Sequence, residues 1–224
     1  MFNKAIEWEL WSKDNPAKYI KQFKEESRER FLESDEIPAF FESLAKEKNT
    51  TIRDYILLSL LTGARQSNVL SMKWEQISFN RSEWLIPKTK NGKPHKLPLV
   101  KEALEILQER KSHSSSDFVL EGKGKTGHLV EAKAGWKRIL KRAGIKNLRL
   151  HDLRRSLGSW QASTGANLSI IGKTLAHKSI STTAIYARLS ISPVRDSMEK
   201  AVGAIYDEKQ QETTADIVQF EKQG

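Results

Sequence analysis

The stretch His151-Asp152-Leu153-Arg154 is the most informative part of this sequence. On a helix, His151 and Arg154 are three residues apart and point to the same side. The imidazole of His151 can transfer a proton, and the guanidinium of Arg154 offers several N–H donors in a fixed planar arrangement. This combination suits a phosphodiester oxygen. The stretch has no pair of metal ligands at helical spacing, and the chain has no cysteine to complete a metal site. It therefore points to phosphate chemistry.

Two further groups follow this stretch at short distance. Leu175-Ala176-His177 adds a second imidazole, and Tyr186 adds a phenol. A phenol beside such a cluster can act as a nucleophile towards phosphorus. Taken singly, each residue has a plainer interpretation: His151 as a helix cap, His177 as a packed core histidine and Tyr186 as a structural tyrosine. The order and spacing of the whole set must decide between these interpretations.

Composition limits the class of protein. The 224 residues suffice for one substantial domain with a small appendage, and a net charge of +10 favours a polyanionic partner, above all nucleic acid. No run of eighteen apolar residues predicts a membrane helix, and Glu7 and Glu9 come too early for a secretory signal. The lack of cysteine excludes a disulfide framework and is compatible with a cytoplasmic location.

The first 30 residues differ in pattern from the rest. A helix is predicted over Ala5–Trp11, and Asn15-Pro16 ends it. The run Lys18–Arg30 then mixes basic and acidic side chains. We interpret it as a linker into the globular part, and a solvated helix without a role fits the charges equally well.

From Ser34 onward the apolar spacing is helical. Thr51-Ile52-Arg53-Asp54 resembles a capping box that opens a helix through Leu61, and Gly63 is a natural stop. The other helices are predicted near Ile37–Leu44, Gln66–Met72, Lys101–Lys111, Glu131–Arg142, Leu150–Ser163, Leu168–Ala176, Thr182–Ala187 and Val194–Ile205.

Between these helices the pattern changes to alternation. Asn80-Arg81-Ser82 and Asn91-Gly92 are turn sequences, and the second is a strong hairpin signal. The segments around them, Ile77–Phe79, Glu83–Ile86 and His95–Leu99, predict three strands. The expected fold class is therefore α+β, mostly helical, with a small three-stranded antiparallel sheet.

An ordered set of motifs gives these observations a family. The set consists of Thr62-Gly63-Ala64-Arg65, Lys90 in a turn between strands, His151-Asp152-Leu153-Arg154, Leu175-Ala176-His177 and Tyr186. In order, and in the spacing from His177 to Tyr186, it resembles the tyrosine recombinase (phage integrase) family. Each motif alone is weak, and the ordered set of six residues is specific. The resemblance implies an integrase-type catalytic domain over residues 31–206, preceded by a remnant of a core-binding domain helix with its linker (1–30) and followed by a polar tail (207–224).

The resemblance also implies roles that agree with the demands of phosphoryl transfer. Arg65 and Arg154 would bind the non-bridging oxygens of the scissile phosphate. Tyr186 would attack phosphorus and give a 3′-phosphotyrosine with a free 5′-hydroxyl. The energy of the broken bond would stay in this link, so no metal and no other cofactor is expected.

The remaining roles concern protons. Lys90 would protonate the leaving 5′ oxygen, His151 would assist proton transfer at the tyrosine, and His177 would donate a hydrogen bond to a phosphate oxygen. Lys90 competes for its role with three neighbouring lysines, Lys88, Lys93 and Lys96. One departure concerns the support of Arg65: family members often have an acid three positions later, where this chain has the uncharged Asn68.

The function that the resemblance implies is site-specific cutting and rejoining of double-stranded DNA, for integration or excision of a phage or genomic island in a bacterial cytoplasm. A homotetramer on DNA is expected, and a monomer is compatible with this chain alone. The alternatives are a type IB topoisomerase-like enzyme, a non-catalytic DNA-binding protein and a metal-dependent nuclease. The last should show a carboxylate cluster, and none stands out.

Overall fold

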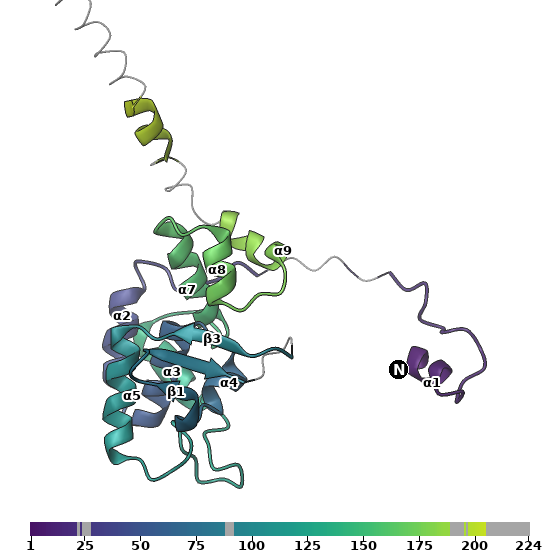
Figure 1. Cartoon of the computed structure of the whole chain (residues 1–224), viewed down its shortest axis with the longest axis horizontal. Coiled ribbons are helices and arrows are strands. Elements are labelled where there is room, and N and C mark those ends of the chain that lie inside the picture. Colours follow the sequence, from purple (N-terminus) through teal and green to yellow (C-terminus); the bar gives the residue numbers. More distant parts are fainter. Residues whose placement is uncertain (22, 24–27, 88–91, 189–194, 196, 205–224) are drawn as a thin grey trace, which may run out of the picture.

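The computed structural model describes residues 1–21, 23, 28–87, 92–188, 195 and 197–204. Most of this part is helical, with one small sheet (Figure 1). Within it, no helix combines the length and apolar content needed to cross a bilayer. The elements are α1 (Phe2–Glu7), α2 (Ile37–Ala45), α3 (Thr50–Thr62), α4 (Gln66–Leu70), η1 (Trp74–Gln76), β1 (Ile77–Ser78), β2 (Glu83–Ile86), β3 (His95–Pro98), α5 (Lys101–His113), α6 (Lys133–Ala143), α7 (Asp152–Ser163), α8 (Leu168–Thr174), α9 (Ile180–Thr183) and η2 (Ala184–Arg188).

Helix α3 runs through the main core and packs against α5 and α7. Its N-terminus differs from the sequence prediction. The capping residue is Asn49, whose side-chain oxygen accepts a hydrogen bond from the backbone N–H of Ile52 at 3.0 Å. The capping box expected at Thr51 was therefore wrong, because an amide in extended backbone two residues earlier already satisfies the first turn. The predicted stop is confirmed, since Gly63 ends α3 with φ of 58°.

The sheet has the predicted order β1-β2-β3 and is antiparallel throughout. Trp84 on β2 pairs with Leu97 on β3, and both are buried in the main core. Leu85 and Lys96 face outward and are exposed. Because side chains alternate along a strand, His95 shares the inward face with Leu97. This places an imidazole at the inner edge of the sheet.

The ends of the chain differ from the prediction in detail. Helix α1 begins three residues earlier than expected and ends at Glu7, and Glu9 adopts a positive φ that a helix cannot continue. At the other end, residues 195 and 197–204 are helical, in agreement with the predicted terminal helix. Its outermost predicted residues, Val194 and Ile205, lie outside the described residues.

A second, smaller core joins α7, α8 and η2. It consists of Ile171, Leu175 and Tyr186, all buried. A segment from the N-terminal part lies along the same α7. The backbone N–H of Leu32 donates to Ser156 Oγ at 2.8 Å, and the indole of Trp160 donates to the carbonyl of Leu32 at 3.0 Å. Helix α7 therefore connects three parts of the chain that are distant in sequence.

Candidate active site

Gly63 positions both of the predicted arginines. Its φ of 58° turns the chain at the end of α3, so that Arg65 stands at the start of α4 two residues later. A side chain could not fit at this point, since a Cβ would lie 2.8 Å from Leu175 Cδ2. The carbonyl of Gly63 also accepts a hydrogen bond from Arg154 Nη1 at 2.6 Å. Gly63 thus sets the backbone position of Arg65 and binds the side chain of Arg154.

Arg154 is buried in α7, with 7% of its surface exposed. Its second terminal nitrogen donates to the carbonyl of Leu175, the residue that follows α8. Burial, and then the nearby charge of Arg65, lower the pKa of Arg154 to about 10. A guanidinium in this environment lacks a compensating anion, which favours the binding of one.

His151 stands immediately before α7, at the cap position that a plainer interpretation of the sequence assigns to it, but no side-chain capping bond is recorded there. Its neighbour Asp152 accepts hydrogen bonds from the backbone N–H of Arg149 at 2.8 Å and from Arg28 at 3.0 Å. Burial lowers the pKa of His151, and the charges of Arg154 and Arg155 lower it further. The imidazole is therefore held towards its neutral form, as a proton acceptor requires.

His177 follows α8 in a fixed orientation. Its Nδ1 lies 2.9 Å from the hydroxyl of Thr183, which is fully buried in α9. Burial, and then the charges of Arg154 and Arg65, lower the pKa of His177 to about 4. The sequence analysis missed Thr183, since a threonine in a serine- and threonine-rich stretch gives no local signal of such a contact.

Four of the six predicted residues line one cavity of about 580 Å³. They are Arg65, His151, Arg154 and His177. The rest of its lining consists of Gln66, Ser67, Leu70 and Thr182, so no described carboxylate faces it. Two guanidiniums and two imidazoles around one hollow form a site for an anion with several oxygens.

Tyr186 lies next to this group but does not line the cavity. Its ring stacks on that of His177 with centroids 6.4 Å apart, and only 2% of the residue is exposed. The ring lies against Gly158 of α7, where a Cβ would come within 2.6 Å of Tyr186 Cζ. Burial raises the pKa of the phenol, and Arg154 and Arg155 partly oppose that effect. In this state the phenol is close to the cavity and packed away from it.

Lys90, the sixth predicted residue, lies outside the described residues. Strand β2 ends at Ile86 and β3 begins at His95, and the part of the predicted turn that holds Lys90, residues 88–91, is not described.

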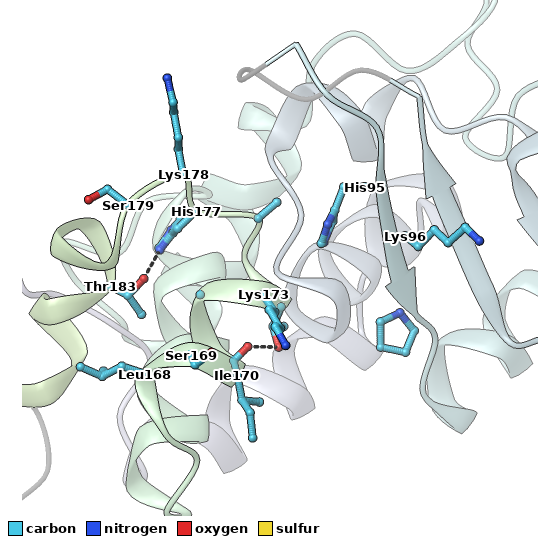
Figure 2. Close-up of a pocket in the computed structure, with 14 residues that line it drawn as sticks. His95, Lys96, Leu168, Ser169, Ile170, Lys173, His177, Lys178, Ser179 and Thr183 are labelled. Carbon is cyan, nitrogen blue, oxygen red and sulfur yellow. Dashed lines mark hydrogen bonds between the residues drawn. The ribbon is translucent and has the colours of Figure 1, made fainter.

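His95 is a site residue that the sequence analysis did not select. It lines a narrow cavity together with Arg65, Asn68 and Arg154. It also lines a larger cavity of about 670 Å³ between β3 and α8, shared with His177 (Figure 2). The sequence did contain a signal for His95. It lies two residues before the buried Leu97 and so on the inward face of the strand, where a histidine usually needs a polar partner.

Comparison with known proteins gives the family. Residues 30–192 match the model of the phage integrase family. The chain belongs to that family. Phage integrase relatives include the tyrosine recombinase XerA of Pyrococcus furiosus, 31% identical over 179 residues that cover 76% of this chain and 61% of that protein. The integrase of Salmonella phage P22 is 28% identical over 197 residues, covering 82% of this chain and 49% of that protein.

Solved structures agree with this membership. The pre-cleavage complex of the XerH site-specific recombinase with difH substrate matches with a TM-score of 0.58 and 25% identity, over 71% of this chain and 50% of that one. The Tn1549 transposon integrase in complex with transposon right end DNA matches with a TM-score of 0.68 and 17% identity, over 90% and 75%. The predicted fold, a mostly helical integrase-type domain with a three-stranded sheet, is confirmed. This chain spans 61% and 49% of the length of the two relatives named above.

Proposed function

We propose that this phage integrase family member cuts and rejoins DNA strands at specific sites through a covalent phosphotyrosine on Tyr186. The observation that carries the proposal is the single cavity that Arg65, His151, Arg154 and His177 share without a described carboxylate. A phosphodiester is the anion on which this arrangement can act, because its two non-bridging oxygens match two guanidiniums.

The proposed reaction begins with the arginines. Arg65 and Arg154 bind the non-bridging oxygens and stabilise the charge that develops on them. We assign the hydroxyl of Thr183, 2.9 Å from His177 Nδ1, as the donor of that hydrogen bond, so that an N–H on Nε2 of His177 can donate to the phosphate. This assignment gives the neutral imidazole a use that its lowered pKa permits.

The nucleophile and the two protons complete the step. The phenolic oxygen of Tyr186 forms a bond to phosphorus while the bond from phosphorus to the 5′ oxygen breaks. His151, neutral and lining the cavity, takes the phenolic proton. Lys90 gives a proton to the 5′ oxygen. Because Tyr186 is packed against Gly158, η2 must move before the phenol can reach a bound phosphorus.

A trapping experiment tests this proposal. The chain is incubated, in EDTA, with a library of nicked duplexes of randomised sequence, in which loss of a short 5′ fragment prevents religation. A protein–DNA adduct that survives denaturation is expected, and sequencing the trapped DNA gives the target site. Tyr186→Phe should abolish the adduct and leave DNA binding nearly unchanged, whereas Tyr19→Phe, an exposed tyrosine near the N-terminus, should retain it.

Other outcomes would favour other functions. An adduct that persists in Tyr186→Phe would assign the nucleophile elsewhere, for example to Tyr206, which lies outside the described residues. Relaxation of supercoiled plasmid without recombinant products would support the topoisomerase-like alternative. DNA binding with no adduct in any variant would support a non-catalytic role.

The wider setting belongs to the same proposal. We propose double-stranded DNA as the partner, a homotetramer on that DNA and a cytoplasmic location, with integration or excision of a mobile element as the biological use. Residues 1–30 would then be the end of a core-binding domain with its linker, and 207–224 a polar tail. Light scattering of the chain bound to duplexes that carry one or two copies of the trapped site measures how many chains assemble on the DNA.

A further inference from the structure

His95 stands where a positioning group for Arg65 is needed. The two residues line the same narrow cavity, and Arg154 and Asn68 line it with them. No described carboxylate lines that cavity either. Of the two guanidiniums, that of Arg154 already donates to the carbonyls of Gly63 and Leu175. No side-chain hydrogen bond is recorded between Arg65 and any other described residue, so its donors have no fixed direction.

The imidazole of His95 has one engaged and one open nitrogen. The backbone of Thr174, which lines the same narrow cavity, raises the pKa of His95, as a carbonyl does when it faces a ring N–H. Nε2 is buried and has no hydrogen-bond partner within the described chain, so we assign the ring proton that faces Thr174 to Nδ1. With its proton on Nδ1, the ring leaves a bare lone pair on Nε2.

The surroundings of His95 favour this neutral form. The charged and titratable groups that line the two cavities with His95 are Arg65 before α4, Arg154 on α7, Lys96 on β3, Lys173 on α8, and His177 and Lys178 after α8. Burial first, and then the charges of Arg154 and Arg65, lower the pKa of the imidazole. A buried lone pair without a donor is costly, and a guanidinium with unused donors lies in the same cavity.

We propose that His95 is a positioning residue whose Nε2 accepts an N–H of Arg65 when that guanidinium closes on a phosphate. The proposal rests on the function proposed above and deepens it, because it names a group that orients Arg65 in a chain where the residue three positions later, Asn68, carries no charge. Thr174 holds the ring on one side, and Arg65 binds it on the other.

Two isosteric substitutions separate this role from a structural one. In His95→Gln the amide oxygen reaches the position of Nε2, so an acceptor for Arg65 remains. In His95→Asn the amide stands at the position of Nδ1, so the bond to Thr174 remains and the acceptor is lost. A role limited to holding β3 against α8 predicts that the asparagine variant is the better one, and a role in positioning Arg65 predicts the reverse.

Inorganic phosphate is the probe, and binding is followed by NMR chemical-shift titration of the whole ¹⁵N-labelled chain. We expect His95→Gln to bind phosphate within about twofold of the original chain and His95→Asn to bind about tenfold more weakly, as for loss of one hydrogen bond to a charged group. Equal affinities, or the opposite order, would overturn the proposal. In the trapping assay with the selected duplex, the same order of adduct rates is expected.

A second measurement needs no substitution, so it remains decisive if either variant fails to fold. Histidine-selective ¹⁵N spectra of the original chain should show His95 with a proton on Nδ1 and none on Nε2 at neutral pH. A proton on Nε2 would contradict the proposal outright. Neither the spectra nor phosphate binding requires Tyr186. Failure of adduct formation would therefore reject the proposed function while leaving the role of His95 at an anion site to be judged on its own data.

Discussion

The two arginines of the site differ in how much of the fold depends on them. Arg154 joins the end of α3 to the end of α8 through two carbonyls, whereas no side-chain hydrogen bond links Arg65 to the described residues. A loss of activity after substitution of Arg154 would therefore combine a chemical effect with a structural one.

We predict that Arg154→Ala lowers the free energy of unfolding by about 3 kcal/mol, because two buried carbonyls lose their donors. Arg65→Ala should change the free energy of unfolding by no more than about 0.5 kcal/mol. It should reduce phosphate binding at least as strongly as Arg154→Ala does. Urea unfolding of both variants, beside phosphate titration, measures this. Equal destabilisation by the two substitutions would show that Arg65 also supports the fold.

The histidines give the stability of the chain a predictable pH dependence. The folded-state pKa of His177 is about 4, against an ordinary value of 6.5, so the unfolded chain takes up its proton first as pH falls. The contribution of His177 is therefore complete above pH 6.5 and is lost between pH 6.5 and 4. His95 and His151 act in the same direction, because burial lowers their pKa values too.

We predict that the free energy of unfolding falls between pH 6.5 and 4.5, and that His177→Asn makes this fall shallower. The window excludes Glu36 and Glu47, whose pKa values are lowered from 4.5, so that their contribution is lost only below it. Urea unfolding at half-unit steps of pH measures the slope. His113→Asn, at the exposed end of α5, is the control and should keep the original slope. An unchanged slope in His177→Asn would contradict the assignment.

At this scale the sequence picked out four residues that line the candidate cavity, and it did not select His95 or Thr183, which contact or border that group. Arg65, His151, Arg154 and His177 were found because each lies in a local motif, and the fold brings them into one cavity. His95 and Thr183 carry no motif, and their importance depends on what faces them across the fold. The chemical roles of all six predicted residues, including Lys90, stay predictions.

At the scale of elements, the packing position of the Tyr186 ring in the second core depends on Gly158 of α7. A Cβ on Gly158 would meet Tyr186 Cζ at 2.6 Å and Leu175 Cδ1 at 3.0 Å. There is thus no space for even one methyl group between α7 and η2.

We predict that Gly158→Ala expels the Tyr186 ring and destabilises the segment α9–η2 by about 1–3 kcal/mol, the usual range for overpacking. Hydrogen exchange should show faster exchange at residues 180–188 and unchanged protection in α3. Gly124→Ala, where a Cβ meets nothing within 4 Å, is the matched control. Unaltered exchange in the Gly158 variant would mean that the ring can shift at no cost.

The predicted elements agree with the structure where periodicity is long and fail at their ends. Helices α3, α5 and α7 lie where their apolar spacing predicts, since burial of one face decides such segments. The capping of α3 by Asn49, in contrast, depends on one backbone conformation that the sequence pattern does not specify. Alternation of apolar and polar residues located β2 and β3 correctly, because one face of each strand is buried. The asparagine–glycine turn signal includes Asn91, which lies outside the described residues.

At the scale of the whole molecule, the net charge of +10 should make binding to DNA strongly dependent on salt. Each phosphate that a cation neutralises contributes about 0.9 to the slope of log K against log salt. In the function proposed above, Arg65 neutralises one such phosphate from the candidate cavity.

We predict that Arg65→Ala reduces this slope by about one unit on the trapped duplex. Lys46→Ala should leave it unchanged, because Lys46 is exposed and already paired with Glu42 at 2.6 Å. Fluorescence anisotropy over a series of salt concentrations measures both. An equal slope for Arg65→Ala and the original chain would mean that Arg65 does not neutralise a backbone phosphate.

The turn at Gly63 has a consequence for how the cavity can vary. The carbonyl of Gly63 accepts a hydrogen bond from Arg154, which lies 91 positions further along the chain. The φ of Gly63 sets the direction in which the chain continues towards Arg65. The backbone rotation at Gly63 therefore affects the distance between the two guanidiniums. That distance in turn sets the spacing of the phosphate oxygens that the pair can bind. Related chains in which this spacing differs should therefore also differ at the residues packed against Gly63, which here are Leu157 and Leu175.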